Sequence, residues 1–203
     1  MEKSRSFPYG QREMDALSAA DPVLGEYIRA TGKIERATHP HLFEELVRSI
    51  IAQQISGKAA VTVGKRVEAL LGEVTPERLL DTDPAVLQLC GLSFRKVGYL
   101  RGIAAEAAAG RLDQAELAEL SDEGVIRRLS ALSGVGVWTA EMLLIFCFER
   151  PDVVSWGDLG IRRGMKKLYG LDELPRAEFD RIRERYRPYG TVASLYLWRR
   201  SVE

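Results

Sequence analysis

Apolar residues recur every three or four positions along most of the chain, and stretches that alternate between apolar and polar residues are nearly absent. In the segment HPHLFEELVRSIIAQQ, for example, Leu42, Leu46 and Ile50 fall on one side of a helix. The same spacing returns in segment after segment toward the C-terminus. This periodicity predicts an all-α protein.

The predicted helices are bounded by residues that commonly start and stop helices. Ser56 precedes the segment GKAAVTVGKRVEALL as an N-cap, and Gly72 follows it. Thr75 and Asp83 each stand directly before a proline, which is a frequent first residue of a helix. The connections are short, as expected for a compact helical domain. Residues 1–12 are expected to be poorly ordered.

The composition says little about a partner. The 203 residues are 46% hydrophobic and 29% charged, which allows an ordinary soluble core. With 29 basic and 29 acidic residues the formal net charge is zero, so bulk charge does not indicate nucleic acid. Basic residues cluster at positions 162–167 and 181–187, where a solvated helix face is an equally good explanation.

The cellular compartment is suggested by the cysteines and by the absence of targeting signals. Cys90 and Cys147 both lie in apolar surroundings, as reduced and buried thiols do. No N-terminal stretch resembles a signal peptide, and no run approaches the roughly 18 apolar residues of a membrane span. We therefore expect a cytoplasmic protein without membrane contact, associated with the nucleoid if the source is bacterial.

A glycine-containing turn between two predicted helices is the first feature that suggests chemistry. It reads LSGVGVWTA, with Gly134, Val135 and Gly136 at its centre and a helix from about Val137. The free N–H groups and the positive dipole end of that helix could hold a phosphate without any charged side chain. A plain tight turn is the alternative, but the longer pattern, which includes Thr139, is more specific.

This turn, together with three further segments, resembles the helix-hairpin-helix (HhH-GPD) DNA glycosylase superfamily. The segments FEELVRSIIAQQISGKAA, GLSFRKVGYLRGIA and VVSWGDLGIRRGM are similar to its alkylation-repair branch, 3-methyladenine DNA glycosylase II, and the similarity runs from about Pro40 to Trp198. The resemblance implies a two-lobed helical fold with a central DNA-binding cleft. One lobe would hold residues 40–145, and the other would combine the N-terminal helices at about 13–38 with residues 146–203.

Asp158 matches the catalytic aspartate of the superfamily. It directly precedes the predicted helix LGIRRGMKKLYG, and a carboxylate is stable in its ionised form at a helix N-terminus. Helix capping alone would also explain an aspartate there. Hydrolysis of a glycosidic bond develops positive charge on the sugar, which a nearby carboxylate stabilises while it orients water. The resemblance therefore favours catalysis.

Trp138 and the cysteine pattern limit the chemistry. In members of the superfamily that also cut the DNA strand, a lysine at the position of Trp138 forms a Schiff base with the sugar. A tryptophan there implies a monofunctional enzyme. Members with an iron–sulfur cluster have four C-terminal cysteines, whereas this chain has none after Cys147, so neither a cluster nor another cofactor is expected. The hairpin carbonyls could hold a monovalent cation, but no side-chain metal site is expected.

The resemblance also assigns a wedge and a base pocket. Gln54 would occupy the intercalating position, with Gln53 beside it, although both could instead be helix-end residues that hydrogen-bond the turn. A cationic base is attracted to electron-rich ring faces. Trp138 and Tyr189 are the candidates for such a pocket, and Trp156 would line the same wall. Core packing is the alternative for each of these rings.

These features predict a monofunctional DNA glycosylase that flips and removes alkylated bases of the 3-methyladenine and 7-methylguanine class. It would act in base excision repair, on double-stranded DNA and as a monomer. One alternative is a non-enzymatic helix-hairpin-helix protein that binds DNA structure and has no use for Asp158. Another is a glycosylase for deaminated or oxidised bases.

Overall fold

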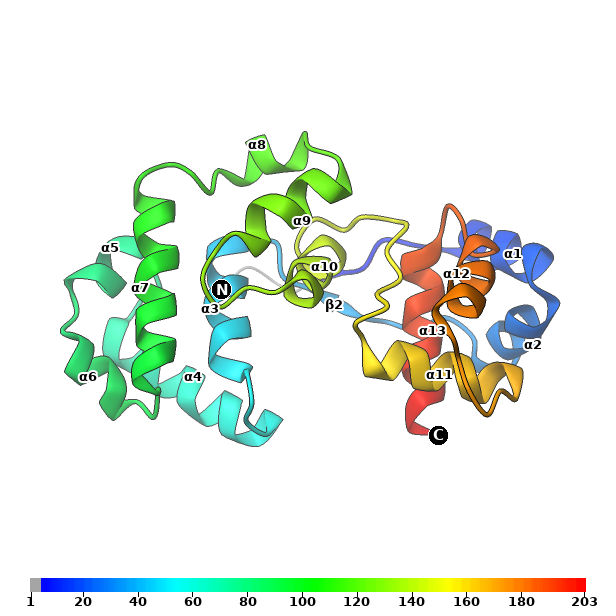
Figure 1. The fold of residues 1–203 in the computed structure, drawn as a ribbon, viewed down its shortest axis with the longest axis horizontal. Helices are drawn as coiled ribbons and strands as arrows, with labels where there is room; N and C mark the ends of the chain where they lie inside the picture. The colour runs from blue at the N-terminus through cyan, green and yellow to red at the C-terminus, as the bar shows by residue number, and fades with distance from the viewer. Residues whose placement is uncertain (1–4) are drawn as a thin grey trace. The chain divides into compact units, whose positions relative to one another are not determined.

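The computed structural model describes residues 5–203 and is predominantly helical, which confirms the all-α prediction (Figure 1). Its only sheet within these residues is an antiparallel pair, β1 (Arg5–Ser6) and β2 (Ala37–Thr38). The helices are α1 (Gln11–Ala20), α2 (Pro22–Thr31), α3 (Leu42–Ala52), α4 (Gly57–Leu71), α5 (Pro76–Asp81), α6 (Pro84–Leu89), α7 (Phe94–Ala108), α8 (Gln114–Ala118), α9 (Asp122–Ser130), α10 (Val137–Phe146), α11 (Leu159–Tyr169), α12 (Arg176–Glu184) and α13 (Gly190–Val202).

The expectation of poor order in residues 1–12 is wrong for the described part of that segment. Strand β1 pairs with β2, and the N–H of Phe7 donates to the carbonyl of Arg36 at 2.7 Å. The Phe7 side chain is buried in a core cluster. Both partners lie some thirty residues further along the chain, so no local pattern could have revealed them. Residues 1–4 lie outside the described residues.

The described residues form two compact units. The hairpin unit is His39–Leu143, and the terminal unit combines the residues up to Thr38 with Leu144–Glu203. The resemblance placed these boundaries near residues 40 and 145, and a DNA-binding cleft between the two lobes stays a prediction. Among the described residues, no helix is both long and apolar enough to cross a lipid bilayer.

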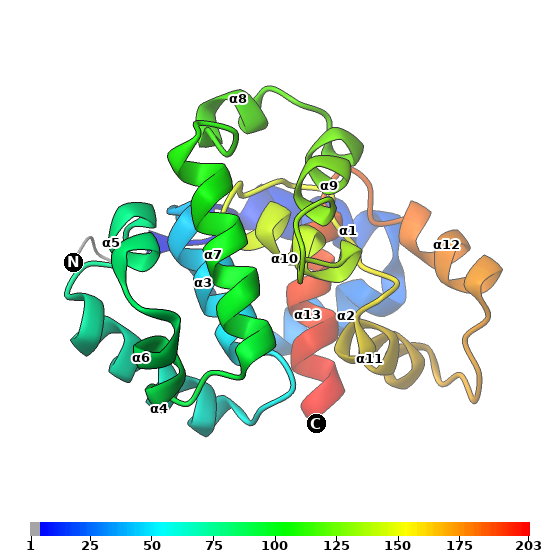
Figure 2. The ribbon, with the colours of Figure 1, turned by 60° about the vertical axis from the view of Figure 1, so that its left-hand side comes forward.

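The hairpin unit is built around α7, which packs against α3 and α5 (Figure 2). The apolar stripe of α3 that the sequence predicts is buried, with Leu46 and Ile50 fully enclosed. Leu100 and Ile103 of α7 are equally buried. Because α7 is anchored by these contacts, side chains on its first turns have fixed positions.

The terminal unit is organised by the crossing of α11 and α13 (Figure 1). A glycine at position 164 permits this close approach, since a Cβ there would collide with the carbonyl oxygen of Leu197. Met165 and Tyr196 are fully buried beside the crossing. The packing brings the last turns of α13 against the N-terminal turn of α11.

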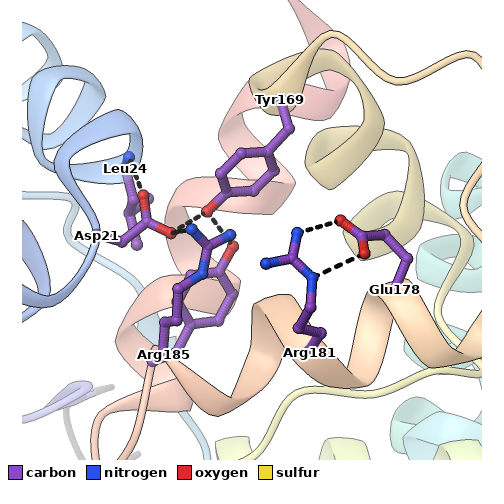
Figure 3. Close-up of polar contacts among 7 residues, drawn as sticks. Asp21, Leu24, Tyr169, Glu178, Arg181 and Arg185 are labelled. Atoms are coloured by element: carbon purple, nitrogen blue, oxygen red, sulfur yellow. Dashed lines mark hydrogen bonds and ion pairs between the residues drawn. The ribbon is translucent and has the colours of Figure 1, made fainter.

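A buried polar cluster joins α2 to α11 and α12 (Figure 3). Asp21 is the N-cap of α2 and accepts the N–H of Leu24 at 3.0 Å. Its other oxygen accepts the Tyr169 hydroxyl at 2.7 Å and pairs with Arg185 at 3.2 Å. The hydroxyls of Tyr169 and Tyr186 lie 2.8 Å apart. Burial raises the pKa of both tyrosines well above the usual range, so both remain neutral donors.

Candidate active site

The Asp158 carboxylate is buried, 7% exposed, at the N-terminus of α11. Its Oδ1 atom accepts the backbone N–H of Ile161 at 2.8 Å, so Asp158 is the N-cap of the helix. The same oxygen accepts the indole N–H of Trp198 at 2.9 Å. Asp158 therefore caps the helix, as the sequence allows, and a second donor from another helix also orients it. Hydrogen bonds of this kind to a charged acceptor are short and directional.

Trp198 is the functional neighbour that sequence reasoning missed. It lies on α13, 40 residues after Asp158, and stacks on Phe146 with ring centroids 5.7 Å apart. The guanidinium of Arg36 lies over the other ring of this pair, 5.1 Å from the centroid of Phe146. A Cβ at Gly160 would lie 2.9 Å from Cδ1 of Trp198 and 3.1 Å from Asp158 Oδ1. The only sequence signal was therefore a glycine that leaves room for the indole.

Trp156 lies in the terminal unit and packs partly buried against its core. The guanidinium groups of Arg162 and Arg176 lie over its ring at 5.0 and 5.3 Å. Its edge meets Phe179 at a centroid distance of 5.0 Å. These contacts agree with core packing, which is the alternative for this residue. A role of Trp156 in a base pocket stays a prediction.

Tyr189 and Trp138 lie in different units. Tyr189 precedes α13 as its N-cap residue and packs partly buried against the core of the terminal unit. Trp138 stands in the first turn of α10, in the hairpin unit, and is 47% exposed. The terminal unit thus carries Asp158, Trp156 and Tyr189, whereas the hairpin unit carries Trp138.

The hairpin between α9 and α10 has the predicted form, but its two glycines serve different needs. Gly134 adopts a φ of +87°, and a Cβ there would collide with the ring of Tyr99. Gly136 has nothing within 4 Å of where its Cβ would be. Val135 and Thr139 have buried side chains. A phosphate bound here would therefore meet backbone N–H groups at the start of α10, and Gly136 leaves space for it.

The wedge turn, residues 53–56 between α3 and α4, separates the two predicted wedge residues. The amide Nε2 of Gln53 donates to the carbonyl of Gly134 at 2.7 Å, so this side chain is engaged with the hairpin. Gln54 is exposed and adopts a φ of +57°, which is rare for a residue other than glycine. Gln53 therefore agrees with the alternative, in which the residue ends a helix and hydrogen-bonds a turn, here that of the hairpin. Gln54 has the exposed position that a wedge requires.

The predicted cation site at the hairpin carbonyls involves atoms that already accept hydrogen bonds. The carbonyl of Leu132 accepts the N–H of Val135 at 3.0 Å, and the carbonyl of Gly134 accepts Gln53. A cation there stays a prediction, because a carbonyl oxygen has two lone pairs. Among residues 5–203 no group of three or more His, Cys, Asp or Glu side chains is arranged to hold a metal ion.

Replacing Gly136 by alanine should weaken binding by about fivefold, the scale of one lost hydrogen bond to phosphate. The loss should be the same for lesion-containing and undamaged DNA, because phosphate contacts carry no sequence or base information. The folded protein has room for the added methyl group, so its thermal stability should be unchanged. Gly102→Ala on α7 is the matched control, since it also adds a methyl in open space. Fluorescence anisotropy titrations measure the affinity of each variant for the two duplexes. Loss of lesion preference at unchanged overall affinity would contradict this interpretation.

Comparison with known proteins agrees with the geometry. The family model of the HhH-GPD superfamily base excision DNA repair protein matches residues 47–188. DNA-3-methyladenine glycosylase 1 of Schizosaccharomyces pombe is 38% identical over 164 residues, which are 78% of this chain and 72% of that protein.

Two solved structures share both sequence and fold with this chain. A DNA-3-methyladenine glycosidase from Bacillus halodurans is 38% identical with a TM-score of 0.88, covering 97% of this chain and 92% of that one. The S. pombe 3-methyladenine DNA glycosylase in complex with abasic DNA is 32% identical with a TM-score of 0.82, covering 93% and 96%. The chain belongs to the HhH-GPD superfamily of base excision DNA repair proteins, as its motifs predict.

Proposed function

We propose that this protein removes alkylated bases, of the 3-methyladenine and 7-methylguanine class, from double-stranded DNA by hydrolysing the N-glycosidic bond. The observation that carries the proposal is the carboxylate of Asp158, buried and oriented by two donors at a helix N-terminus. The relatives named DNA-3-methyladenine glycosylases support it, as does the relative whose structure contains abasic DNA, the product of such a reaction.

The chemistry needs one anion and a good leaving group. An N3- or N7-alkylated purine is cationic, so the electron pair of the breaking C1′–N bond neutralises it without help from an acid. The sugar becomes positively charged as the bond breaks, and the Asp158 carboxylate stabilises that charge. A water molecule then forms the new C1′–O bond and gives its proton to the carboxylate or to solvent. The products are the free base and an intact strand with an abasic site.

Strand cutting is not part of the proposal. Trp138, half exposed in the first turn of α10, has no amine to form an imine with the opened sugar. The Lys96 ammonium donates to the carbonyls of Ile51 and Gln53, which ties it to the protein. We further propose that the enzyme acts as a monomer in the cytoplasm, associated with the nucleoid in a bacterium, without an iron–sulfur cluster or other cofactor.

Incubation with a duplex that contains one 7-methylguanine should release the free base and leave a strand that breaks only in hot alkali. Borohydride should trap no protein–DNA adduct. A neutral lesion such as hypoxanthine should react far more slowly, since the proposed mechanism includes no acid that would protonate the departing base. Chromatography of the released bases and denaturing gels of the labelled strand measure these results.

Each alternative gives a different result in that experiment. A protein that binds the duplex but releases no base is a DNA-structure-binding module. Efficient release of hypoxanthine indicates a glycosylase for other bases. A trapped adduct indicates that Lys58 or another amine provides a strand-cutting route.

A further inference from the structure

The wedge turn is attached to the DNA-binding hairpin by a side chain that the proposed reaction does not use. The Gln53 amide donates to the Gly134 carbonyl at 2.7 Å, across 81 residues of sequence. Gly134 is the residue whose positive φ shapes the hairpin. One hydrogen bond therefore connects the turn that carries Gln54 to the turn that would hold phosphate.

Side chains of helix α7 contact both turns. The ammonium of Lys96 donates to the carbonyl of Ile51 at 2.8 Å and to that of Gln53 at 2.6 Å. These carbonyls stand at the C-terminal end of α3, where helices lack internal donors and where a cation is favoured. One turn further along α7, the ring of Tyr99 lies directly against Gly134. The same helix face thus fixes the backbone of the wedge turn and that of the hairpin.

Gln54 stands in a backbone conformation that needs such support. A φ of +57° is unfavourable for a glutamine, and residues in such conformations persist only where neighbouring contacts fix the chain. The contacts here fall on the residue immediately before it, through both the side chain and the carbonyl of Gln53. Gln54 is exposed in this conformation, so its side chain is accessible to a bound duplex.

We propose that Lys96 and Gln53 are positioning residues that hold the wedge turn rigidly on the hairpin, so that capture of the DNA backbone and displacement of the base occur together. The inference rests on the proposed function. A wedge can unstack a base only if its turn does not move when the stacked bases resist insertion. The hairpin binds phosphate, so a wedge turn fixed to the hairpin is also fixed relative to the DNA backbone. Neither residue touches the reacting atoms in this scheme.

The inference is tested by comparing a lesion in a fully paired duplex with the same lesion opposite an abasic site, where the base is already unpaired. In Lys96→Met and Gln53→Met, excision from the paired duplex should fall about tenfold, the scale of a lost hydrogen bond to a backbone carbonyl. Excision from the unpaired substrate should change less than about twofold, because little displacement is needed there. Single-turnover rates measure both.

Matched controls come from the same unit. Gln114 bonds the N–H of Leu42 and the carbonyl of Pro40, at the opposite end of α3. Arg101, also on α7, bonds the carbonyls of Leu80 and Thr82. Gln114→Met and Arg101→Met should lower thermal stability as much as the test variants do. They should leave the ratio of paired to unpaired excision at its wild-type value.

A second readout requires no chemistry. 2-Aminopurine placed beside the lesion becomes fluorescent when the base stack opens, and the Lys96 and Gln53 variants should show less of this signal at saturating protein. Equal losses on the paired and unpaired substrates, or an unchanged ratio with unchanged fluorescence, would overturn the inference. If the wild-type protein releases no base from either substrate, the proposed function fails, and the fluorescence still decides whether the two residues control base displacement.

Discussion

Replacing Asp158 by asparagine should lower the rate of base excision at least ~10²-fold, the usual scale for a group that stabilises charge at the reacting centre. Affinity for lesion-containing DNA should stay within about threefold of the wild type, because backbone contacts dominate it. Asparagine has nearly the same shape, and its amide oxygen can accept the same N–H of Ile161, so the helix cap survives. The negative charge is lost, and the second carboxylate oxygen becomes an NH2 group that donates hydrogen bonds. Single-turnover excision and anisotropy titrations measure the two quantities.

The control for this variant is another aspartate that caps a helix. Asp113 accepts the N–H of Glu116 at 2.9 Å at the start of α8, in an exposed position. Asp113→Asn should leave both excision and affinity unchanged. Near-normal excision by Asp158→Asn would show that Asp158 is only a cap, whereas equal losses of excision and binding would point to a structural defect in the site.

Trp198 offers a graded version of the same experiment. Phenylalanine there keeps the stacking on Phe146 but removes the N–H that reaches Asp158 Oδ1. The carboxylate then keeps its charge and its helix cap and loses one orienting donor. Because a side-chain donor to a charged acceptor contributes less than the charge itself, the loss of rate should fall well short of that in Asp158→Asn.

The helices could be predicted from the sequence because their signals are local. Neighbouring residues alone predict Ser56, Thr75 and Asp83 as caps, and each accepts a backbone N–H at the start of its helix. Asp158 was placed at a helix N-terminus by the same reasoning, and it caps α11. Apolar spacing and capping residues act within a few positions, so one sequence contains them in full.

The remaining parts of the site depend on contacts between distant segments. The indole that orients Asp158 reaches it only because α11 and α13 cross closely at Gly164, and no local pattern marks that pair. Adjacency in the sequence pairs Gln53 with Gln54, yet the side chain of Gln53 donates to the carbonyl of Gly134 on the hairpin. Local sequence patterns can therefore single out candidate residues, but they cannot say which distant residues contact them.

Replacing Asp21 by alanine should destabilise the protein by about 3 kcal/mol, at the lower end of the cost of breaking a buried ion pair. Asp21 has no exposed surface, accepts hydrogen bonds from the N–H of Leu24 and the hydroxyl of Tyr169, and forms an ion pair with Arg185 (Figure 3). Its removal leaves a helix N-terminus uncapped and a guanidinium beside two tyrosine hydroxyls without its anion. The estimate is at the lower end because the Arg185 side chain is 33% exposed, and water screens part of its charge. Urea denaturation followed by circular dichroism measures the loss.

Two further variants divide that loss into its sources. Asp21→Asn keeps an oxygen for the N–H of Leu24 and removes the charge, so the difference in stability between Asp21→Asn and Asp21→Ala measures the contribution of the cap. Asp83→Ala removes an exposed cap at α6 that has no ion pair in the described structure, and it should cost only about 1 kcal/mol. If Asp21→Ala costs no more than Asp83→Ala, the buried cluster contributes nothing beyond capping. A larger loss means that the cluster holds α2 against α11 and α12, and therefore supports the helix whose N-terminus carries Asp158.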